Sequence, residues 1–442
     1  MAQDAAAVRP LKIVYIAAGA GPMYCGACAR DIALVRALME RGHDVTVVPL
    51  YTPLRVDGSK PVETEPVFLG GINAYLQQKS GLFRRLPPAL DRFLDNPTLL
   101  RWVSRFAIST APSKLGDMTV SVLAGQQGNQ AKEVDRLLEF LEAMGAPDAF
   151  VITNTLLTGI APTLKARFHA PVLCGIQGED VFVDSLGSPH RERAYEHMRR
   201  NAESIDLFLS PGDSYADLMA DLLQVGRERF RTVRAGISTA EHRRPGPRVR
   251  EPFTLGYLSV ICRPKGLDIL VDAWRKLVGE GREVVLRVAG RVMDPRYWRQ
   301  VERSINATRG GRFEILGEVD FPGKISFLHS CSAFSVPSRQ RETRGMAVLE
   351  ALAAGVPVVA PDAGVYPEML SLAPGGILVP GENPDALAAA LARLMDDPDE
   401  ADALGEAGAR GVAENYEASV VVDAMLAALE KVRARKPDQQ VS

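Results

Sequence analysis

The chain has 442 residues, of which 46% are hydrophobic and 24% are charged. This length exceeds what one hydrophobic core supports and predicts two or three domains, while the formal net charge of -2 excludes a general attraction to nucleic acid. No apolar run reaches the roughly 20 residues that a membrane-spanning helix needs. Five cysteines, without the spacing of a disulfide framework, are typical of a reduced cytoplasmic protein.

The first predicted element is a buried parallel strand at residues 11–18, followed by a glycine-rich loop, a helix over 29–39 and a strand at 45–50. Few basic residues precede the first apolar run and glycines follow it, so we interpret it as a strand and not as a secretory signal. Gly21 and Gly26 allow the loop to lie against a sugar or phosphate. The glycine spacing differs from the dinucleotide fingerprint, which argues against a nicotinamide-dependent dehydrogenase.

Cys25 and Cys28 form a C-x-x-C at the expected start of this helix. A helix N-terminus lowers the pKa of a thiol, which would suit a redox or metal-binding role. The sequence contains no second cysteine pair with zinc-ligand spacing, so we favour simple packing of small residues.

Residues 79–105 carry arginines and a lysine interleaved with apolar and aromatic residues. One interpretation is a basic amphipathic segment that contacts anionic lipid or an acidic acceptor, which predicts a peripheral membrane contact. The other is a helical excursion that packs its apolar side on the domain and keeps its arginines in water. The pattern alone favours the second interpretation.

Further along, the α/β alternation returns with predicted strands at 149–153 and 171–176. The second of these runs into three polar residues, Gln177, Glu179 and Asp180. The carboxyl end of a parallel strand is where open α/β sheets bind ligands, so these residues are candidates for a site. Gln177 can hydrogen-bond to a hydroxyl or a carbonyl but cannot titrate.

A run rich in Arg and Pro at residues 238–252 has no apolar period. We interpret it as the linker between a first domain at 1–237 and a second domain at 253–418. The second domain opens with a strand and a loop that contains Arg263 and Lys265 before the next helix. A cationic loop that leads into a helix N-terminus is typical of a phosphate site.

The most informative stretch combines a loop, a short helix, a strand and an acidic loop. Glu342 and Glu350 stand eight positions apart across the start of the helix. At about 1.5 Å per residue they lie at most roughly 12 Å apart along a helix axis, which suits gripping two ends of an elongated ligand. The free N–H groups around Gly345, Met346 and Ala347 favour an anion such as a diphosphate.

This stretch, with the preceding Pro-Ser and the following Ala-x-Gly-x-Pro-Val-Val segment, resembles the E-x7-E signature of the family 4 retaining glycosyltransferases, in the glycosyl transferases group 1. The resemblance implies that Glu342 faces the donor sugar and that Glu350 binds the ribose of a nucleotide sugar. It also implies that Lys265 holds the diphosphate. The arginine that the family places after the glycine of the preceding strand is absent here, and Arg263 is either its substitute or a free surface residue.

Two more positions carry this resemblance. Val319 falls where members of the family wrap backbone groups around the base. The strand end that carries Gln177 here often carries His in the family, where that His contacts the donor sugar. The departure argues against a general base at this point and leaves Glu179 and Asp180 as the polar candidates.

The resemblance implies the GT-B architecture, an α/β fold with two Rossmann-like domains whose parallel sheets face each other across a cleft, and a helix at 419–435 that packs back on the first domain. It further implies a retaining transfer of a hexose from a nucleoside diphosphate sugar to a hydroxyl acceptor, which is a glycan, a lipid-linked sugar or a small molecule. No cofactor is expected, and no metal, although Asp397 and Asp399 mimic an Asp-x-Asp motif.

Two alternatives stay open on the sequence alone. One is a sugar phosphorylase or synthase on the same fold, and the other is a non-catalytic scaffold that binds nucleotide sugars. We expect a cytoplasmic protein without a nucleic-acid partner, with peripheral contact at the inner membrane face as the one membrane association.

Overall fold

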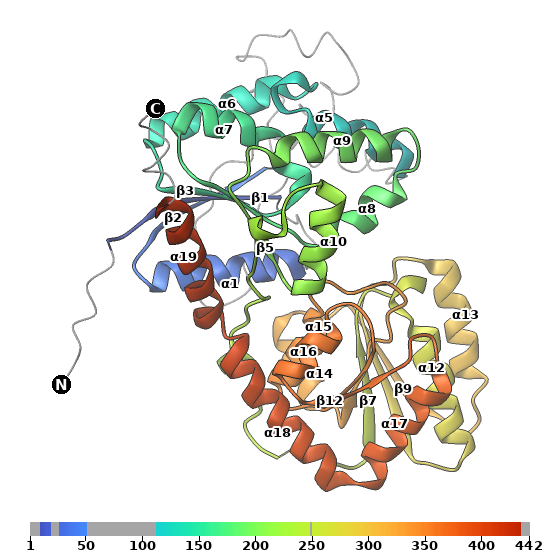
Figure 1. The fold of residues 1–442 in the computed structure, drawn as a ribbon. Helices are drawn as coiled ribbons and strands as arrows, with labels where there is room; N and C mark the ends of the chain where they lie inside the picture. The colour runs from blue at the N-terminus through green and yellow to red at the C-terminus, as the bar shows by residue number, and fades with distance from the viewer. Residues whose placement is uncertain (1–8, 19–25, 51–111, 248–249, 435–442) are drawn as a thin grey trace, which may run out of the picture. The chain divides into compact units, whose positions relative to one another are not determined.

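The computed structural model of the protein describes residues 9–18, 26–50, 112–247 and 250–434 (Figure 1). The chain divides into two compact units, one of Met1–Val233 with Val422–Ser442 and the other of Arg234–Val421. Residues 238–252, interpreted above as a linker, belong to the second unit. Gly21, Cys25 and residues 79–105 lie outside the described residues.

Within the described residues, the first unit holds a six-stranded sheet in the order β2-β1-β3-β4-β5-β6, with every pair parallel. Every residue of β3, β4 and β5 is buried, as expected for strands covered on both faces. The strands are β1 (Lys12–Ala17), β2 (Asp44–Pro49), β3 (Ala149–Ile152), β4 (Val172–Gly175), β5 (Leu207–Ser210) and β6 (Phe230–Thr232).

Alternate residues of a strand point to opposite faces of the sheet, and here the residues on both faces are buried and mostly apolar. Helices therefore cover both faces. Val14 and Ile16 pack with α5, α6, α7, α9 and α10, whereas Tyr15 and Val151 lie near residues of α1 and α19 (Figure 1). The helices are α1 (Gly26–Glu40), α5 (Pro112–Leu123), α6 (Ala131–Met144), α7 (Ala161–Phe168), α8 (Glu179–Ser185), α9 (His190–Ala202), α10 (Asp213–Leu223) and α19 (Ala418–Ala434), with a short 3-10 helix at Thr155–Ile160.

The last helix, α19, is tied to the first unit by hydrogen bonds from two arginine side chains. Arg41 Nη2 donates to Asp423 Oδ2 at 2.9 Å, and Arg433 Nη2 donates to Asp148 Oδ1 at 3.2 Å. The C-terminal residues from Val422 therefore complete the unit that the N-terminus begins. No helix of the described segments is long and apolar enough to cross a bilayer.

The second unit repeats the same design, with a parallel sheet that has the order β12-β11-β10-β7-β8-β9 among the described residues. The strands are β7 (Phe253–Leu258), β8 (Val284–Ala289), β9 (Arg312–Gly317), β10 (Ala333–Phe334), β11 (Val358–Pro361) and β12 (Gly376–Val379). The helices are α11 (Thr239–His242), α12 (Leu267–Gly279), α13 (Pro295–Asn306), α14 (Phe321–His329), α15 (Met346–Ala353), α16 (Tyr366–Leu372), α17 (Pro384–Asp396) and α18 (Pro398–Asn415).

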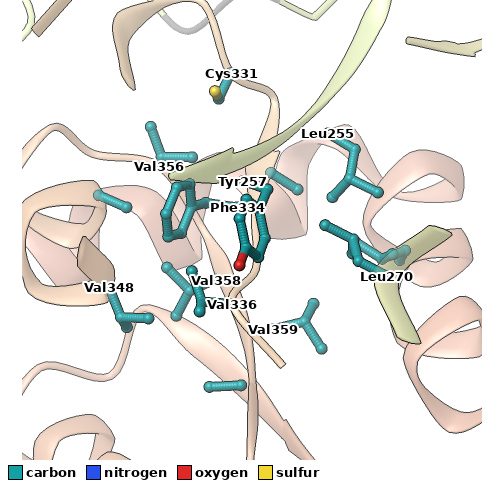
Figure 2. Close-up of a cluster of buried hydrophobic side chains, with 14 of the residues drawn as sticks. Leu255, Tyr257, Leu270, Cys331, Phe334, Val336, Val348, Val356, Val358 and Val359 are labelled. Carbon is teal, nitrogen blue, oxygen red and sulfur yellow. The ribbon is translucent and has the colours of Figure 1, made fainter. Parts of the chain in front are cut away.

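The core of this unit packs aromatic rings of β7 and β10 against branched side chains. Tyr257 and Phe334 are fully buried and lie side by side among Val336, Val348 and Val358 (Figure 2). These residues come from the strands and loops that lead into the candidate site, so the core fixes the direction in which those loops leave the sheet.

Helix α18 carries three glycines at a spacing of three, Gly405, Gly408 and Gly411, all buried. A Cβ on Gly405 would lie 2.3 Å from the carbonyl oxygen of Gly355, and one on Gly411 would lie 2.4 Å from Cα of Ala373. The helix therefore packs directly on the neighbouring backbone, at a distance that only glycine permits. Before it, Asp397 Oδ1 accepts a hydrogen bond from the backbone N–H of Glu400 at 2.9 Å, which makes it a helix cap.

Candidate functional site

The sheet of the second unit has a switch point between β7 and β10. These strands are neighbours, yet the chain continues from β7 to β8 on one side and from β10 to β11 on the other. In open parallel sheets the loops that diverge at such a point form the ligand-binding crevice. Here they are residues 259–266 after β7 and residues 335–345 after β10.

These two loops touch, and they bring a lysine and a glutamate together. Gly266 has φ 71°, and a Cβ there would lie 1.9 Å from the carbonyl oxygen of Pro337, so only glycine permits the approach. Lys265 Nζ donates a hydrogen bond to Glu342 Oε1, and the two side chains are 18% and 15% exposed. Two residues predicted from separate motifs thus form one partly buried ion pair at the switch point.

The arginines near this pair have different environments. Arg263 is exposed. Arg339, which the sequence analysis did not single out, forms two hydrogen bonds of 2.7 Å to Asp268 and one of 2.9 Å to Glu382. Burial raises the pKa of Asp268, but hydrogen bonds from Arg339 and Tyr297 outweigh burial and leave that pKa below its usual value. Arg339 therefore holds the loop after β10 in place through its hydrogen bonds, whereas the side chain of Arg263 is exposed to solvent.

The predicted short helix is α15, and it begins directly after Gly345, which has φ 59°. A Cβ on Gly345 would lie 2.9 Å from Cε1 of Tyr366, so glycine is required both by conformation and by space. No side chain among the described residues caps this end of the helix, and Met346 and Ala347 in its first turn are partly exposed. Their N–H groups lack partners within the helix, which gives this end partial positive charge.

The backbone of Glu342 is held by the loop after β11. Val365 N–H donates to the carbonyl oxygen of Glu342 at 2.8 Å. Gly364 approaches so closely that a Cβ there would lie 2.5 Å from the same oxygen. The predicted acidic loop after β11 therefore fixes the backbone position from which the side chain of Glu342 extends.

Glu350 is less accessible than its expected role suggests, being 6% exposed. Its Oε1 accepts a hydrogen bond from Lys324 Nζ at 2.6 Å, and the side chains are 8% and 5% exposed. His242 Nε2 lies 3.9 Å from the same oxygen. Neither Lys324 nor His242 was predicted as a neighbour of Glu350, because both are far from it along the chain.

Val319, expected to contribute backbone to a base site, follows β9 and is partly buried against the core. The next residue, Asp320, caps α14 by accepting a hydrogen bond from Gly323 N–H at 2.9 Å. Lys324 belongs to this same helix, so the loop that carries Val319 leads directly into the helix that carries the partner of Glu350.

In the first unit, the carboxyl end of β4 carries a network around Glu179, which is 4% exposed. Its carboxylate accepts hydrogen bonds from the backbone N–H groups of Thr155 at 3.0 Å and Gln177 at 2.6 Å. Tyr215 OH donates to Asp180 Oδ1 at 2.8 Å, and Gln177 Nε2 donates to the carbonyl oxygen of Thr153.

This network orders the strand end. Burial raises the pKa of Tyr215 well above its usual value, and the neighbouring carboxylates of Glu179 and Asp180 raise it further, so the phenol stays a hydrogen-bond donor. Glu179 thus anchors backbone groups, whereas Gln177 and Asp180 remain partly exposed. Gly26, the other glycine predicted for the first unit's loop, is the first residue of α1.

Comparison with known proteins identifies the class. A model of the glycosyl transferases group 1 matches residues 238–411, and a model of a glycosyl transferase 4-like domain matches residues 32–236. The phosphatidyl-myo-inositol mannosyltransferase of Mycobacterium tuberculosis is 32% identical over 197 residues, which are 44% of this chain and 51% of that protein. A GDP-mannose-dependent alpha-(1-6)-phosphatidylinositol monomannoside mannosyltransferase of Mycolicibacterium smegmatis is 28% identical over 229 residues, which are 46% of this chain and 59% of that protein.

Solved structures share the fold at low sequence identity. Sucrose-phosphate synthase from Thermosynechococcus elongatus has a TM-score of 0.67 and 17% identity, and the match covers 96% of this chain and all of that one. Anabaena HepE in complex with UDP and glucose has a TM-score of 0.64 and 13% identity, with 95% of this chain covered and all of that one.

The two parallel sheets and these neighbours define a two-domain GT-B fold. The chain belongs to the glycosyl transferases group 1, that is, to family 4, since the two family models together account for most of its length. The fold predicted from sequence is confirmed. The match spans 37% to 51% of the length of the first relatives, so what those proteins transfer is not carried over by similarity alone.

Proposed function

We propose that this chain is a retaining, metal-independent glycosyltransferase that moves a hexose from a nucleoside diphosphate sugar to a hydroxyl acceptor. The observation that carries the proposal is the convergence of Lys265, Glu342 and the uncapped start of α15 at the switch point of the second sheet. A cation and a helix N-terminus bind the diphosphate. A carboxylate beside them meets the sugar, where positive character develops during transfer.

In this proposal Lys265 and the N–H groups of Met346 and Ala347 stabilise the charge that appears on the leaving diphosphate, so no metal is assigned to the reaction. Glu342 contacts the hexose and Glu350 the ribose. The acceptor's proton passes to the leaving phosphate oxygen as the new bond forms on the same face of the sugar. Gln177 orients a hydroxyl and takes no proton, in keeping with its chemistry.

The donor is best sought among a few nucleotide sugars. The names of relatives specify GDP-mannose and phosphatidylinositol acceptors, while structural neighbours were solved with UDP, UDP-glucose or ADP. We propose GDP-mannose as the first donor to test and a lipid-linked hydroxyl as the first acceptor. Residues 79–105 are the proposed peripheral contact with an anionic membrane, on the inner face of which the protein would act.

Thermal shift against GDP-mannose, UDP-glucose and ADP-glucose tests donor binding, since a ligand at 100 times its Kd stabilises by about 2.7 kcal/mol. Transfer to an inositol phospholipid, assayed with and without EDTA, then tests the reaction, and the anomeric configuration of the product tests retention. Sugar phosphate formed with inorganic phosphate as acceptor would instead support a phosphorylase. Binding of a donor without transfer or hydrolysis would support a scaffold.

A further inference from the structure

Behind α15, three ionisable side chains meet in the interior of the second unit. Glu350 is 6% exposed, Lys324 of α14 is 4% exposed and His242 of α11 is 3% exposed. Lys324 Nζ lies 2.6 Å from Glu350 Oε1 and 4.8 Å from the ring centre of Phe321. An isolated charge in such a place would be neutralised or expelled, so these groups must be considered together.

The hydrogen bonds fix what each group contributes. His242 Nδ1 lies 2.8 Å from the carbonyl oxygen of Ser238, which only accepts, so Nδ1 carries a proton. His242 Nε2 has no hydrogen-bond partner among the described residues. Burial lowers the pKa of His242, which keeps the ring neutral and leaves Lys324 as the cation next to Glu350.

The two oxygens of Glu350 are therefore unequal. Oε1 is held by Lys324, while no hydrogen bond from the described parts of the chain reaches Oε2. A carboxylate oxygen has two lone pairs and can accept from two adjacent hydroxyl groups. Such a pair of hydroxyls is what the ribose of a nucleotide offers and what a 2′-deoxyribose lacks.

We propose that Lys324 is the positioning residue for Glu350: it supplies the countercharge of the buried carboxylate and holds Oε1, so that Oε2 is presented to the ribose hydroxyls of the donor. This rests on the proposed function, in which Glu350 binds ribose. A contribution to folding stability alone does not explain a lysine at this buried position, because well-packed apolar residues often replace a buried ion pair without loss of stability. Through Glu350, Lys324 therefore determines the preference of the site for ribose over deoxyribose.

The test compares Kd values for GDP and 2′-deoxy-GDP, and for UDP and 2′-deoxy-UDP, by calorimetry between pH 6 and 8.5. The ratio within a pair cancels the ionisation of the phosphates. In the wild type we expect the ribonucleotide to bind roughly 10- to 100-fold more tightly. Lys324→Met should bring the ratio close to one, because it leaves the buried carboxylate without its countercharge and without the donor that holds Oε1.

Lys324→Gln separates charge from position and guards against a variant that does not fold. It keeps a donor to Oε1 and removes only the charge, so the ratio should lie between that of Lys324→Met and that of the wild type. The groups that face Glu350 are Lys324 and His242, with Glu241 near the histidine. A matched control is Lys276→Met, which breaks a lysine–aspartate contact on the surface, with Asp385, and should leave the ratio unchanged.

The outcomes are distinguishable. A folded Lys324→Met or Lys324→Gln variant that keeps the wild-type ratio at every pH overturns the assignment of Lys324 and leaves the proposed function standing. A wild-type protein that binds the ribonucleotide and its deoxy form equally well overturns the ribose role of Glu350. A wild-type protein that binds none of the four nucleotides overturns the proposed function itself.

Discussion

The ion pair between Lys265 and Glu342 yields a double-mutant prediction for nucleotide binding. Lys265→Ala removes a charge-assisted contact to the diphosphate worth about 1.5–3 kcal/mol, which corresponds to a Kd roughly 10- to 150-fold weaker. In that variant Glu342 also loses its partner, so a partly buried carboxylate faces the incoming anion. Glu342→Gln removes that repulsion and frees Lys265, and this variant should bind a nucleoside diphosphate more tightly than the wild type while transferring sugar poorly.

The coupling between the two positions is the quantity to measure. We expect Lys265→Ala to cost about 1 kcal/mol more with Gln at position 342 than with Glu342 present, because only in the Gln variant is Lys265 fully available to the diphosphate, and this difference is within the range found for residues in direct contact. Calorimetric titration of GDP or UDP into the wild type, both single variants and the double variant, at one ionic strength, gives this coupling. Effects that add to within about 0.5 kcal/mol would refute the competition between Glu342 and the diphosphate for Lys265.

Four further predictions follow from the described residues and from the sequence. Glu342→Gln should lower kcat by about 100-fold or more, whereas Glu350→Ala should mainly raise donor KM; steady-state kinetics that give both variants the same signature would remove the assignment of a sugar end and a ribose end. His242→Gln should flatten the acid side of the thermal stability profile: burial lowers the pKa of His242, so below about pH 6.5 the unfolded chain binds a proton that the folded one does not, and stability falls by up to about 1.4 kcal/mol per pH unit. Parallel curves of Tm against pH for this variant and the wild type would contradict it. Gly345→Ala should destabilise the second unit by about 1–3 kcal/mol in chemical denaturation because it forces a side chain into a left-handed conformation; an unchanged midpoint would show that the loop adapts. Liposome co-sedimentation through residues 79–105 should rise with anionic lipid and fall with salt, and binding indifferent to both would end the membrane proposal.

Much of the fold was predictable because its signals are local. Runs of β-branched residues flanked by glycine predict the parallel strands, and the helix that begins after Gly345 was predicted from its own residues. The two acids of the E-x7-E stretch are likewise visible as a spacing. Features of this kind depend on backbone preferences within a few residues, which the sequence displays directly.

The pairings of charged side chains were not predictable, because they join residues that are distant along the chain. Lys324 is 26 positions from Glu350, and its one signal is a lysine on a short, mostly apolar helix. Lys265 and Glu342 are 77 positions apart and meet only through the strand order of the sheet. Glu179 was predicted as a ligand-binding candidate from its place after a strand, but its carboxylate accepts hydrogen bonds from buried backbone N–H groups. The sequence does not distinguish these two roles of a polar residue at a strand end.

The glycines of α18 bear on any attempt to make this protein more heat-resistant. Replacing helical glycine by alanine is a routine gain of about 0.5–1 kcal/mol where the backbone permits it, and a redesign guided by propensity alone would choose Gly405, Gly408 and Gly411 first. Those three lie directly on the neighbouring backbone, so an added methyl group would push the helix away from the segments at Gly355, Gly375 and Ala373. Gly279, at the end of α12 with open space around it, is the safer place to begin.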